Sequence, residues 1–128
     1  MKTRTLGIAL VAVGLLLVCV PLFAHHGTAS YDTSKTVTVK GTVTDFQFMN
    51  PHVLVFLDAK DDKGNVQKWQ GELTSPNHLA RNGWTKNSLK LGDEITLGGY
   101  PAKNGANSIW ITKVVLADGT ALDPSVGN

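Results

Sequence analysis

Apolar and polar residues alternate along the chain beyond residue 35, and this two-residue period is typical of β-strands with one buried face. In the first alternating stretch, 35–49, the apolar positions are Val37, Val39 and Val43, followed by Phe46 and Phe48. The phenylalanines lie in the opposite phase to the valines, so the alternation slips by one residue near Thr44-Asp45. A β-bulge produces such a slip. We therefore expect a long, bent first strand.

Four more strands are predicted by similar apolar runs between turn-forming residues. They cover 52–58, 66–73, 94–100 and 108–116. Between the third and fourth strands, Ser75-Pro76 has the form of a helix N-cap followed by proline at the first helical position, and Gly83 supplies a stop. The sequence thus predicts one short helix over 77–82.

The predicted order is strand, strand, strand, short helix, strand, strand. This order matches the five-stranded OB-like barrel, with one short helix between strands 3 and 4. A small β-sandwich is the alternative, but it does not account for the position of the helix. We therefore expect a mainly β protein with an OB-like barrel over 35–122 and a C-terminal tail over 123–128.

The first 24 residues have the three parts of a secretory signal peptide. Lys2 and Arg4 give a positively charged start. An uncharged apolar run follows from Leu6 to Val20, and Pro21 to Ala24 then break the run and end in a small residue. An uncleaved anchor is the competing interpretation, since the run is almost long enough to span a bilayer. The proline break favours cleavage. We therefore expect a periplasmic or secreted domain without a membrane span, starting with a polar lead-in over 25–34.

Cysteine usage and charge exclude several classes of function. The one cysteine, Cys19, lies inside the apolar run, so a cleaved chain contains neither disulfides nor a thiol nucleophile. The formal net charge of +2 is removed with Lys2 and Arg4, and the remaining basic residues are scattered. Nucleic-acid binding requires clustered positive charge. We therefore expect no nucleic-acid partner.

Short motifs along the chain resemble those of a family of small exported bacterial proteins of unknown function. The matching pieces are Ala24-His25-His26, Tyr31-Asp32, Val39 to Val43, Asn50-Pro51-His52, Trp69 with Glu72, Ser75 to Leu79, Gly83-Trp84, Leu89 to Asp93 and Asp118-Gly119. In relatives an aromatic residue, often tryptophan, precedes the Asn-Pro-His unit, and here Phe48 holds that place. The resemblance implies export and an OB-like barrel, but no agreed activity.

A cluster of candidate metal ligands follows from the predicted strand pairing. If the hairpin after the second strand is centred near Lys63, position 54 opposes 72 and position 52 opposes 74, so His52 and Glu72 are diagonal neighbours. The end of the first strand and the start of the helix lie at the same end of the meander, which adds Met49 and His78. Each residue also has a structural interpretation that stays open. His52 could form a hydrogen bond that fixes the Asn-Pro turn, and Glu72 could form an ion pair with a lysine. Met49 could pack in the core, and His78 could be exposed to solvent.

Cleavage after Ala24 creates a second group of nitrogen donors. His25 then carries a free α-amine beside its imidazole, and His26 adds a third nitrogen. Nitrogen-rich sites favour Cu(II) most strongly among the divalent first-row metals. We expect the first strand to begin opposite His52, so a shared site requires the lead-in to run back along the barrel, over at most about 33 Å. The structural alternative is that both histidines belong to the processing site or to a protein-contact tail.

The sequence favours a binding module over an enzyme, because it contains no marked nucleophile–base pair, phosphate-binding loop or cysteine motif. The first hypothesis is a periplasmic module that binds copper or another transition metal, with candidate ligands His25, His26, His52, His78, Glu72 and Met49. The second is a module that binds an oligosaccharide, peptide or partner protein through the aromatic residues Trp84, Tyr100 and Trp110. The third is a copper enzyme with an amino-terminal histidine brace.

Overall fold

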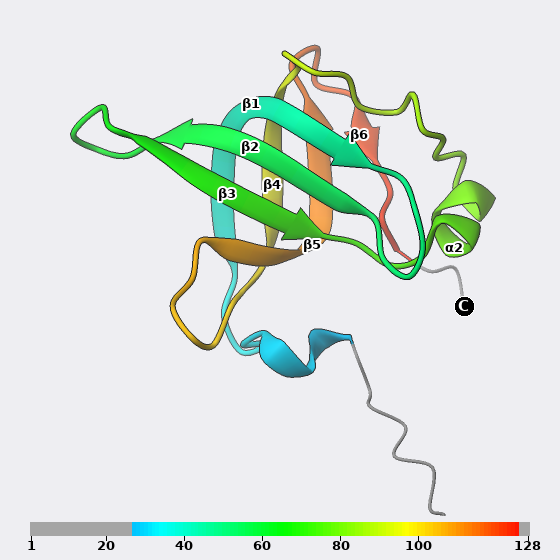
Figure 1. Ribbon diagram of the computed structural model, residues 1–128, viewed down its shortest axis with the longest axis horizontal. Helices are drawn as coiled ribbons and strands as arrows, with labels where there is room; N and C mark the ends of the chain where they lie inside the picture. Colours follow the sequence, from blue (N-terminus) through cyan, green and yellow to red (C-terminus); the bar gives the residue numbers. More distant parts are fainter. Residues whose placement is uncertain (1–26, 126–128) are drawn as a thin grey trace, which may run out of the picture.

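Strands are the main regular secondary structure in the part of the chain that the computed structural model describes, which is residues 27–125 (Figure 1). The elements are η1 (Thr28–Ser30), β1 (Val37–Gln47), β2 (Leu54–Lys60), β3 (Val66–Glu72), α2 (Pro76–Arg81), β4 (Glu94–Pro101), β5 (Ser108–Leu116) and β6 (Ala121–Leu122). The predicted signal peptide and the residues His25 and His26 lie outside the described range. Within that range, no helix has the length and apolar character needed to cross a membrane.

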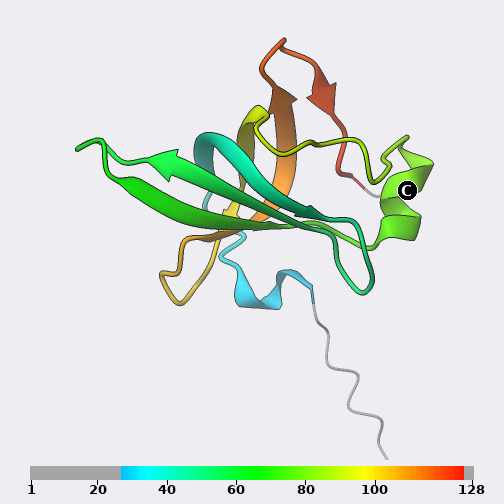
Figure 2. The same ribbon diagram turned by 45° about the horizontal axis from the view of Figure 1, so that its top comes forward.

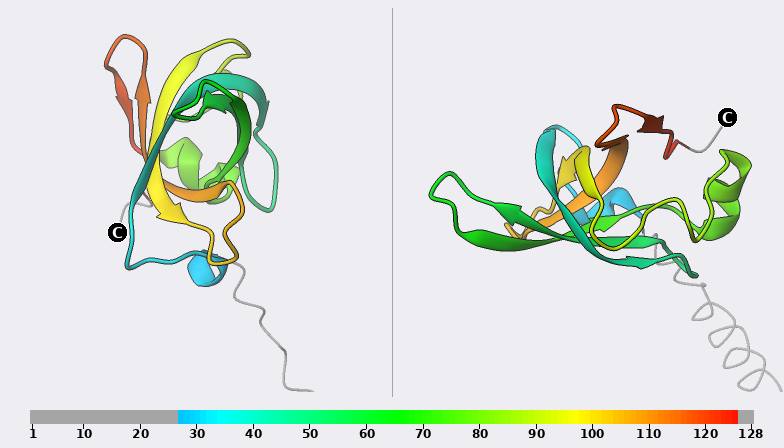
Figure 3. Two further views of the ribbon diagram at one scale, coloured as in Figure 1. Left: turned by 90° about the vertical axis from the view of Figure 1, so that its left-hand side faces the viewer. Right: turned by 90° about the horizontal axis from the view of Figure 1, so that it is seen from above.

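Five of the strands close into a barrel. The hydrogen-bonded order is β3-β2-β1-β4-β5-β6, and a parallel pairing of β3 with β5 closes the five-stranded part. The strands form a ring when the molecule is viewed from the side of the β2–β3 hairpin (Figure 3, left). Helix α2 lies between β3 and β4 in the chain. The predicted OB-like barrel is therefore confirmed, and the alternative β-sandwich is wrong.

The sixth strand, β6, lies outside the ring and was not predicted. It pairs antiparallel with β5 through Val114↔Leu122 and Val115↔Ala121. Two residues are too few for an alternating pattern to be recognised. Because β6 lies beside β5, it covers part of an edge that the ring leaves open.

The long first strand pairs with both of its neighbours in turn. Residues 37–42 pair with β4, and residues 42–47 pair with β2. The register shifts between Val43 and Asp45, which confirms the predicted bulge. Glycine is required where the two pairings meet, because a Cβ on Gly41 would lie only 2.5 Å from the carbonyl oxygen of Asp58.

Inward-facing aliphatic side chains fill the barrel, and α2 closes one end of it. The fully buried residues include Val43, Val53, Val55, Leu57, Leu73, Leu79, Ile95, Leu97, Ile109 and Val114. Trp84, which follows the helix, is 3% exposed and donates from its indole N–H to the carbonyl oxygen of Asp123 at 2.7 Å. Ser75 and Pro76 take the predicted N-cap and first helical positions.

The described part of the lead-in, residues 27–34, packs against the outside of the barrel. Its 3-10 turn, η1, lies below the start of β5 in both Figure 1 and Figure 2. Tyr31 forms an isolated bridge with Ala102, and the backbone N–H of Lys103 donates to the carbonyl oxygen of Ser30 at 3.0 Å. Tyr31 is only 5% exposed. The lead-in is therefore fixed to the loop between β4 and β5.

Candidate functional site at the junction of β3 and β5

His52 and Glu72 are in contact, as the predicted register requires. Leu54 pairs with Glu72 across β2 and β3, and the N–H of Val53 donates to the carbonyl oxygen of Thr74 at 3.1 Å. This pairing places Nδ1 of His52 2.5 Å from Oε1 of Glu72. The partner of Glu72 is therefore a histidine, and its interpretation as the partner of a lysine is wrong.

The other carboxylate oxygen of Glu72 binds the lead-in. The hydroxyl of Tyr31 donates to Oε2 at 2.5 Å, and the hydroxyl of Ser108 lies 3.3 Å from the same phenol oxygen. The lead-in has no hydrophobic period from which this contact could be predicted, so sequence reasoning missed it. The carboxylate of Glu72 thus links Tyr31 of the lead-in to His52, which lies just before β2.

Trp110 completes the group, because it opposes Glu72 in the short parallel pairing of β3 and β5. Its ring centroid lies 5.9 Å from that of Tyr31 and 5.8 Å from that of His52, and the imidazole meets the indole at 84°. We call Tyr31, His52, Glu72, Ser108 and Trp110 the junction cluster. Their neighbours in β3 and β5, such as Gly71 and Ile109, are buried, so the cluster lies on the outer surface of the barrel.

The phenol of Tyr31 is held in its protonated form. Burial raises the pKa of Tyr31 to about 12, and the hydrogen bond to Glu72 and the charge of that residue act in the same direction. The hydrogen bond from Ser108 acts against them but is outweighed. Tyr31 therefore remains a hydrogen-bond donor throughout the ordinary pH range.

The His52 ring is oriented by its neighbours, and within residues 27–125 its second nitrogen has no hydrogen-bond partner. A carboxylate can only accept, so Nδ1 is assigned as the donor to Glu72, and Nε2 of the neutral ring carries the lone pair. Trp110 packs against the ring from a second direction. The side chain of His52 is 22% exposed. Nε2 is therefore the ring nitrogen whose lone pair a metal ion would take.

Of the predicted ligands in the described range, Met49 and His78 are not joined to the junction cluster, and His25 and His26 lie outside that range. Met49 is 58% exposed, so its interpretation as a core residue is wrong. His78 has Nδ1 3.1 Å from Oγ1 of Thr74. Within residues 27–125, no group of three or more His, Cys, Asp or Glu side chains could hold a metal ion.

The lead-in reaches Glu72, the partner of His52, which corrects the expectation that the first strand begins at the opposite end of the barrel from His52. Val37 at the start of β1 pairs with the end of β4, and the end of β4 pairs with the start of β5. The start of β5 in turn pairs with the end of β3. The lead-in therefore has to cross only these neighbouring strand ends before Tyr31 reaches Glu72.

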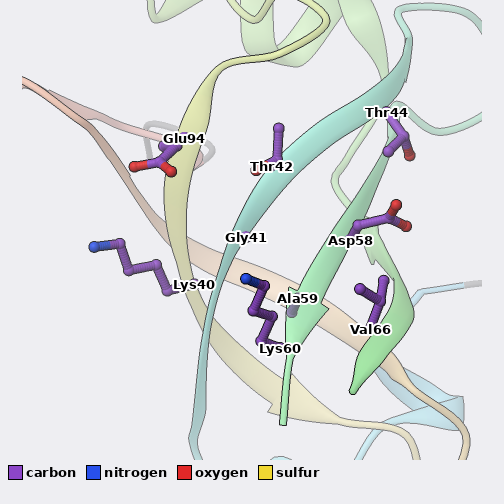
Figure 4. Close-up of a pocket in the computed structure, with 9 residues that line it drawn as sticks. All are labelled: Lys40, Gly41, Thr42, Thr44, Asp58, Ala59, Lys60, Val66 and Glu94. Carbon is purple, nitrogen blue, oxygen red and sulfur yellow. The ribbon is translucent and has the colours of Figure 1, made fainter. Parts of the chain in front are cut away.

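A hollow of about 560 Å³ lies elsewhere, between β1 and the β2–β3 hairpin (Figure 4). It is lined by Lys40, Gly41, Thr42, Thr44, Asp58, Ala59, Lys60, Val66 and Glu94. None of these residues belongs to the junction cluster, and none is aromatic or a histidine. The charges around the hollow are of both signs, so they favour no ligand of one charge.

The aromatic residues of the non-metal hypothesis do not form one exposed surface. Trp84 is buried under the helix, so its suggested role as a surface contact is wrong. Trp110 is partly covered by Tyr31 and His52 in the junction cluster. Tyr100 opposes Trp110 across β4 and β5 and is half-buried. Trp84, Tyr100 and Trp110 therefore do not form one surface for stacking on a ligand.

Comparisons with known proteins show a family and a similar fold, and they assign no activity. The profile of a family described as "Family of unknown function (DUF6152)" matches residues 12–109. No curated protein matches the chain. Among solved structures, the chain is similar to Rim1, a mitochondrial single-stranded DNA-binding protein of S. cerevisiae, with a TM-score of 0.50 and 8% identity, covering 65% of this chain and 93% of that one. At this identity the likeness concerns the fold alone.

Proposed function

Because the chain belongs to the family of unknown function DUF6152, we propose its function from the junction cluster: an exported binding module that holds copper, or another transition metal, through histidines. His52 is the ligand on the barrel, and His25 and His26 supply further nitrogen donors from the amino terminus that signal cleavage would create. The role is metal handling or support of a copper-dependent process.

The contact between His52 and Glu72 is the observation that carries this proposal. Metal-binding histidines commonly donate their second ring N–H to a carboxylate, which fixes the tautomer and makes the free nitrogen a better ligand. Nδ1 of His52 has such a partner at 2.5 Å, and Nε2 is left as the coordinating nitrogen. In this arrangement Glu72 orients the ligand and does not itself bind the metal.

The anchoring of Tyr31 supports the contribution of His25 and His26. Tyr31 is bound to the same carboxylate as His52, and five positions separate it from His26. A chain of five residues spans at most about 17 Å. Because this segment is short, we infer that it raises the effective concentration of His25 and His26 at Nε2 of His52.

Copper is the metal that this donor set favours. An α-amine and three imidazoles are nitrogen ligands, and the affinity of such sites peaks at Cu(II) in the divalent first-row series. An amino-terminal histidine that chelates through its amine and ring also resembles the brace of copper enzymes. The junction cluster itself offers no feature that favours such an enzyme. We therefore propose metal binding rather than catalysis.

Native mass spectrometry of the protein that begins at His25, titrated with Cu(II) and Zn(II), tests the proposal. We expect one tightly held copper ion, which is lost or strongly weakened by His52→Ala, by removal of His25-His26, and by an extra residue placed before His25. Met49→Ala and His78→Ala are the matched controls and should keep the copper. Weak uptake that is equal in all these proteins would overturn the proposal.

A further inference from the structure

We propose that a second hollow of the barrel binds a neutral sugar, whose ring stacks on Trp69 and whose hydroxyls bind the side-chain amides of Gln67 and Asn107. This hollow, which we call the hairpin hollow, has a volume of about 340 Å³. It is lined by Thr38, Val39, Lys40, Ala59, Lys60, Asp61, Gln67, Trp69 and Asn107. None of these residues belongs to the junction cluster, so the inference is independent of the proposed metal binding.

The β2–β3 hairpin supplies one wall of the hairpin hollow, because it extends beyond the ring of strands (Figure 1). Leu57 pairs with Trp69 and Ala59 pairs with Gln67 across the two strands. Leu57 and Ala59 are buried, so Trp69 and Gln67 share the inner face of the hairpin with them. Trp69 packs against the core with only part of its surface, and the rest of its surface lines the hollow.

The lining of the hairpin hollow has an apolar part that suits the carbon face of a sugar. Val39 and Ala59 line it, and both are buried members of the core. The face of an aromatic ring carries partial negative charge, whereas the C–H groups on the face of a sugar ring are slightly positive. A sugar therefore stacks on tryptophan through its C–H groups, and its hydroxyls point sideways to polar neighbours.

The indole N–H of Trp69 is a hydrogen-bond donor at this place. Within residues 27–125 it has no hydrogen-bond partner, whereas the indole N–H of Trp84 donates to the carbonyl oxygen of Asp123. In the same range no polar side-chain atom is both buried and unpaired. The indole N–H of Trp69 is therefore accessible to solvent, and a hydroxyl of a bound sugar can accept its hydrogen bond.

Two amides line the hairpin hollow, and each is fixed by one hydrogen bond. Nε2 of Gln67 donates to Oδ2 of Asp61 at 3.3 Å, which leaves the amide oxygen of Gln67 as an acceptor. The backbone carbonyl oxygen of Asn107 accepts from the N–H of Gln70 at 3.0 Å, so this residue is held beside β3 while its side chain is exposed. An amide both donates and accepts, and so does a sugar hydroxyl.

The charges at the hairpin hollow favour an uncharged ligand. Lys40, Lys60 and Asp61 line it, so both signs are present. Asp61 is engaged by its own hairpin loop, because it accepts from the backbone N–H groups of Lys63 and Asn65. A nucleic acid requires clustered positive charge, which this lining does not supply. The volume lies at the lower end of the roughly 300–1,000 Å³ of small-molecule sites, which suits one or two sugar rings.

An NMR titration of the isotope-labelled, metal-free protein tests the inference. The probes are three neutral disaccharides, namely cellobiose, maltose and N,N′-diacetylchitobiose, and oligodeoxythymidylate is the anionic comparison. We expect at least one disaccharide to shift the indole N–H signal of Trp69 and the side-chain amide signals of Gln67 and Asn107 until they saturate. The indole signals of Trp84 and Trp110 are the internal controls and should not move.

Substitutions in the lining should weaken the same binding. Trp69→Leu keeps an apolar side chain against the core but removes the stacking face and the indole N–H, so saturable binding should be lost. Asn107→Ala removes one amide and should weaken binding by about three- to tenfold, the usual effect of losing a neutral hydrogen bond. Asn87→Ala is the matched control, because Asn87 is an exposed loop asparagine that does not line the hollow.

Three results would overturn the inference. The first is the absence of saturable shifts with all three disaccharides. The second is a saturable shift that leaves the Trp69 signal unchanged, because the sugar then binds elsewhere. The third is a shift of the Trp69 signal by oligodeoxythymidylate but by no sugar, which would make the hollow a base-stacking site. All three are read from the wild-type protein, so they decide the question even if Trp69→Leu does not fold. Copper uptake is measured separately and is not affected by any of these outcomes.

Discussion

Tyr31 donates a hydrogen bond of 2.5 Å to Glu72, a residue 41 positions later in the chain. This bond ties the lead-in to the end of β3 beside the place where the barrel closes. The parallel pairing of β3 with β5 has only three register pairs, from Gln70↔Ser108 to Glu72↔Trp110. Tyr31 contacts both strands of this short pairing, so the lead-in stabilises the closure as well as the orientation of His52.

Removing the hydroxyl of Tyr31 is expected to destabilise the folded protein. Tyr31→Phe keeps the ring against Trp110 but leaves Oε2 of Glu72 without its donor, and a hydrogen bond to a charged group contributes about 1.5–3 kcal/mol. We expect a loss of that size in the free energy of unfolding, measured by urea titration. Tyr100→Phe is the matched control and should change the free energy by less than about 0.5 kcal/mol. Equal effects of the two substitutions would contradict the role of the bond.

Alkaline pH should remove the same stabilisation. The pKa of Tyr31 is raised to about 12 in the folded protein, whereas the unfolded chain ionises near the ordinary value of 10.0. The unfolded state therefore loses the proton first, and stability that is complete below pH 10 falls as the pH rises towards 12. The fall amounts to at most about 2–3 kcal/mol. Urea titrations of wild type and Tyr31→Phe at several pH values should show the difference between them shrinking over this window, whereas a constant difference would contradict the prediction.

The sequence was sufficient to predict the contact between His52 and Glu72, because alternation and one hairpin centre determine which positions of two adjacent strands meet. It was not sufficient to predict the contacts of Tyr31. The lead-in has no period, and its position depends on how the ends of β3, β4 and β5 come together in the closed barrel. The same closure explains why the start of β1 was expected too far from His52. Local patterns describe neighbouring strands well, but the parallel pairing of β3 and β5 joins segments with a helix and a strand between them.

The start of β5 depends on a glycine in β4. A Cβ on Gly99 would overlap the carbonyl oxygen of Trp110, next to the register shift between Gly98 and Gly99. Gly99→Ala should therefore push β5 away and cost about 3 kcal/mol or more. Gly98→Ala is the control, since its Cβ would lie 3.4 Å from that of Lys113 and should change stability by less than about 1 kcal/mol. Thermal unfolding compares the two variants, and similar stability would show that the backbone relaxes easily at this point.

Replacing Glu72 distinguishes a carboxylate that orients His52 from one that binds the metal itself. Glu72→Gln keeps the size of the side chain but removes the charge that Nδ1 of His52 faces. Loss of such a partner weakens metal binding by about 10- to 100-fold while the ligands stay the same. We therefore expect a weaker copper complex, measured by competition with a chelator, whose EPR spectrum stays close to that of the wild type. Asp58→Asn is the matched control, because Asp58 lies on β2 and pairs with Lys68 at 3.2 Å, outside the junction cluster. A changed EPR spectrum in Glu72→Gln alone would instead show that Glu72 is a copper ligand. An unchanged copper affinity would show that Glu72 has no role in copper binding.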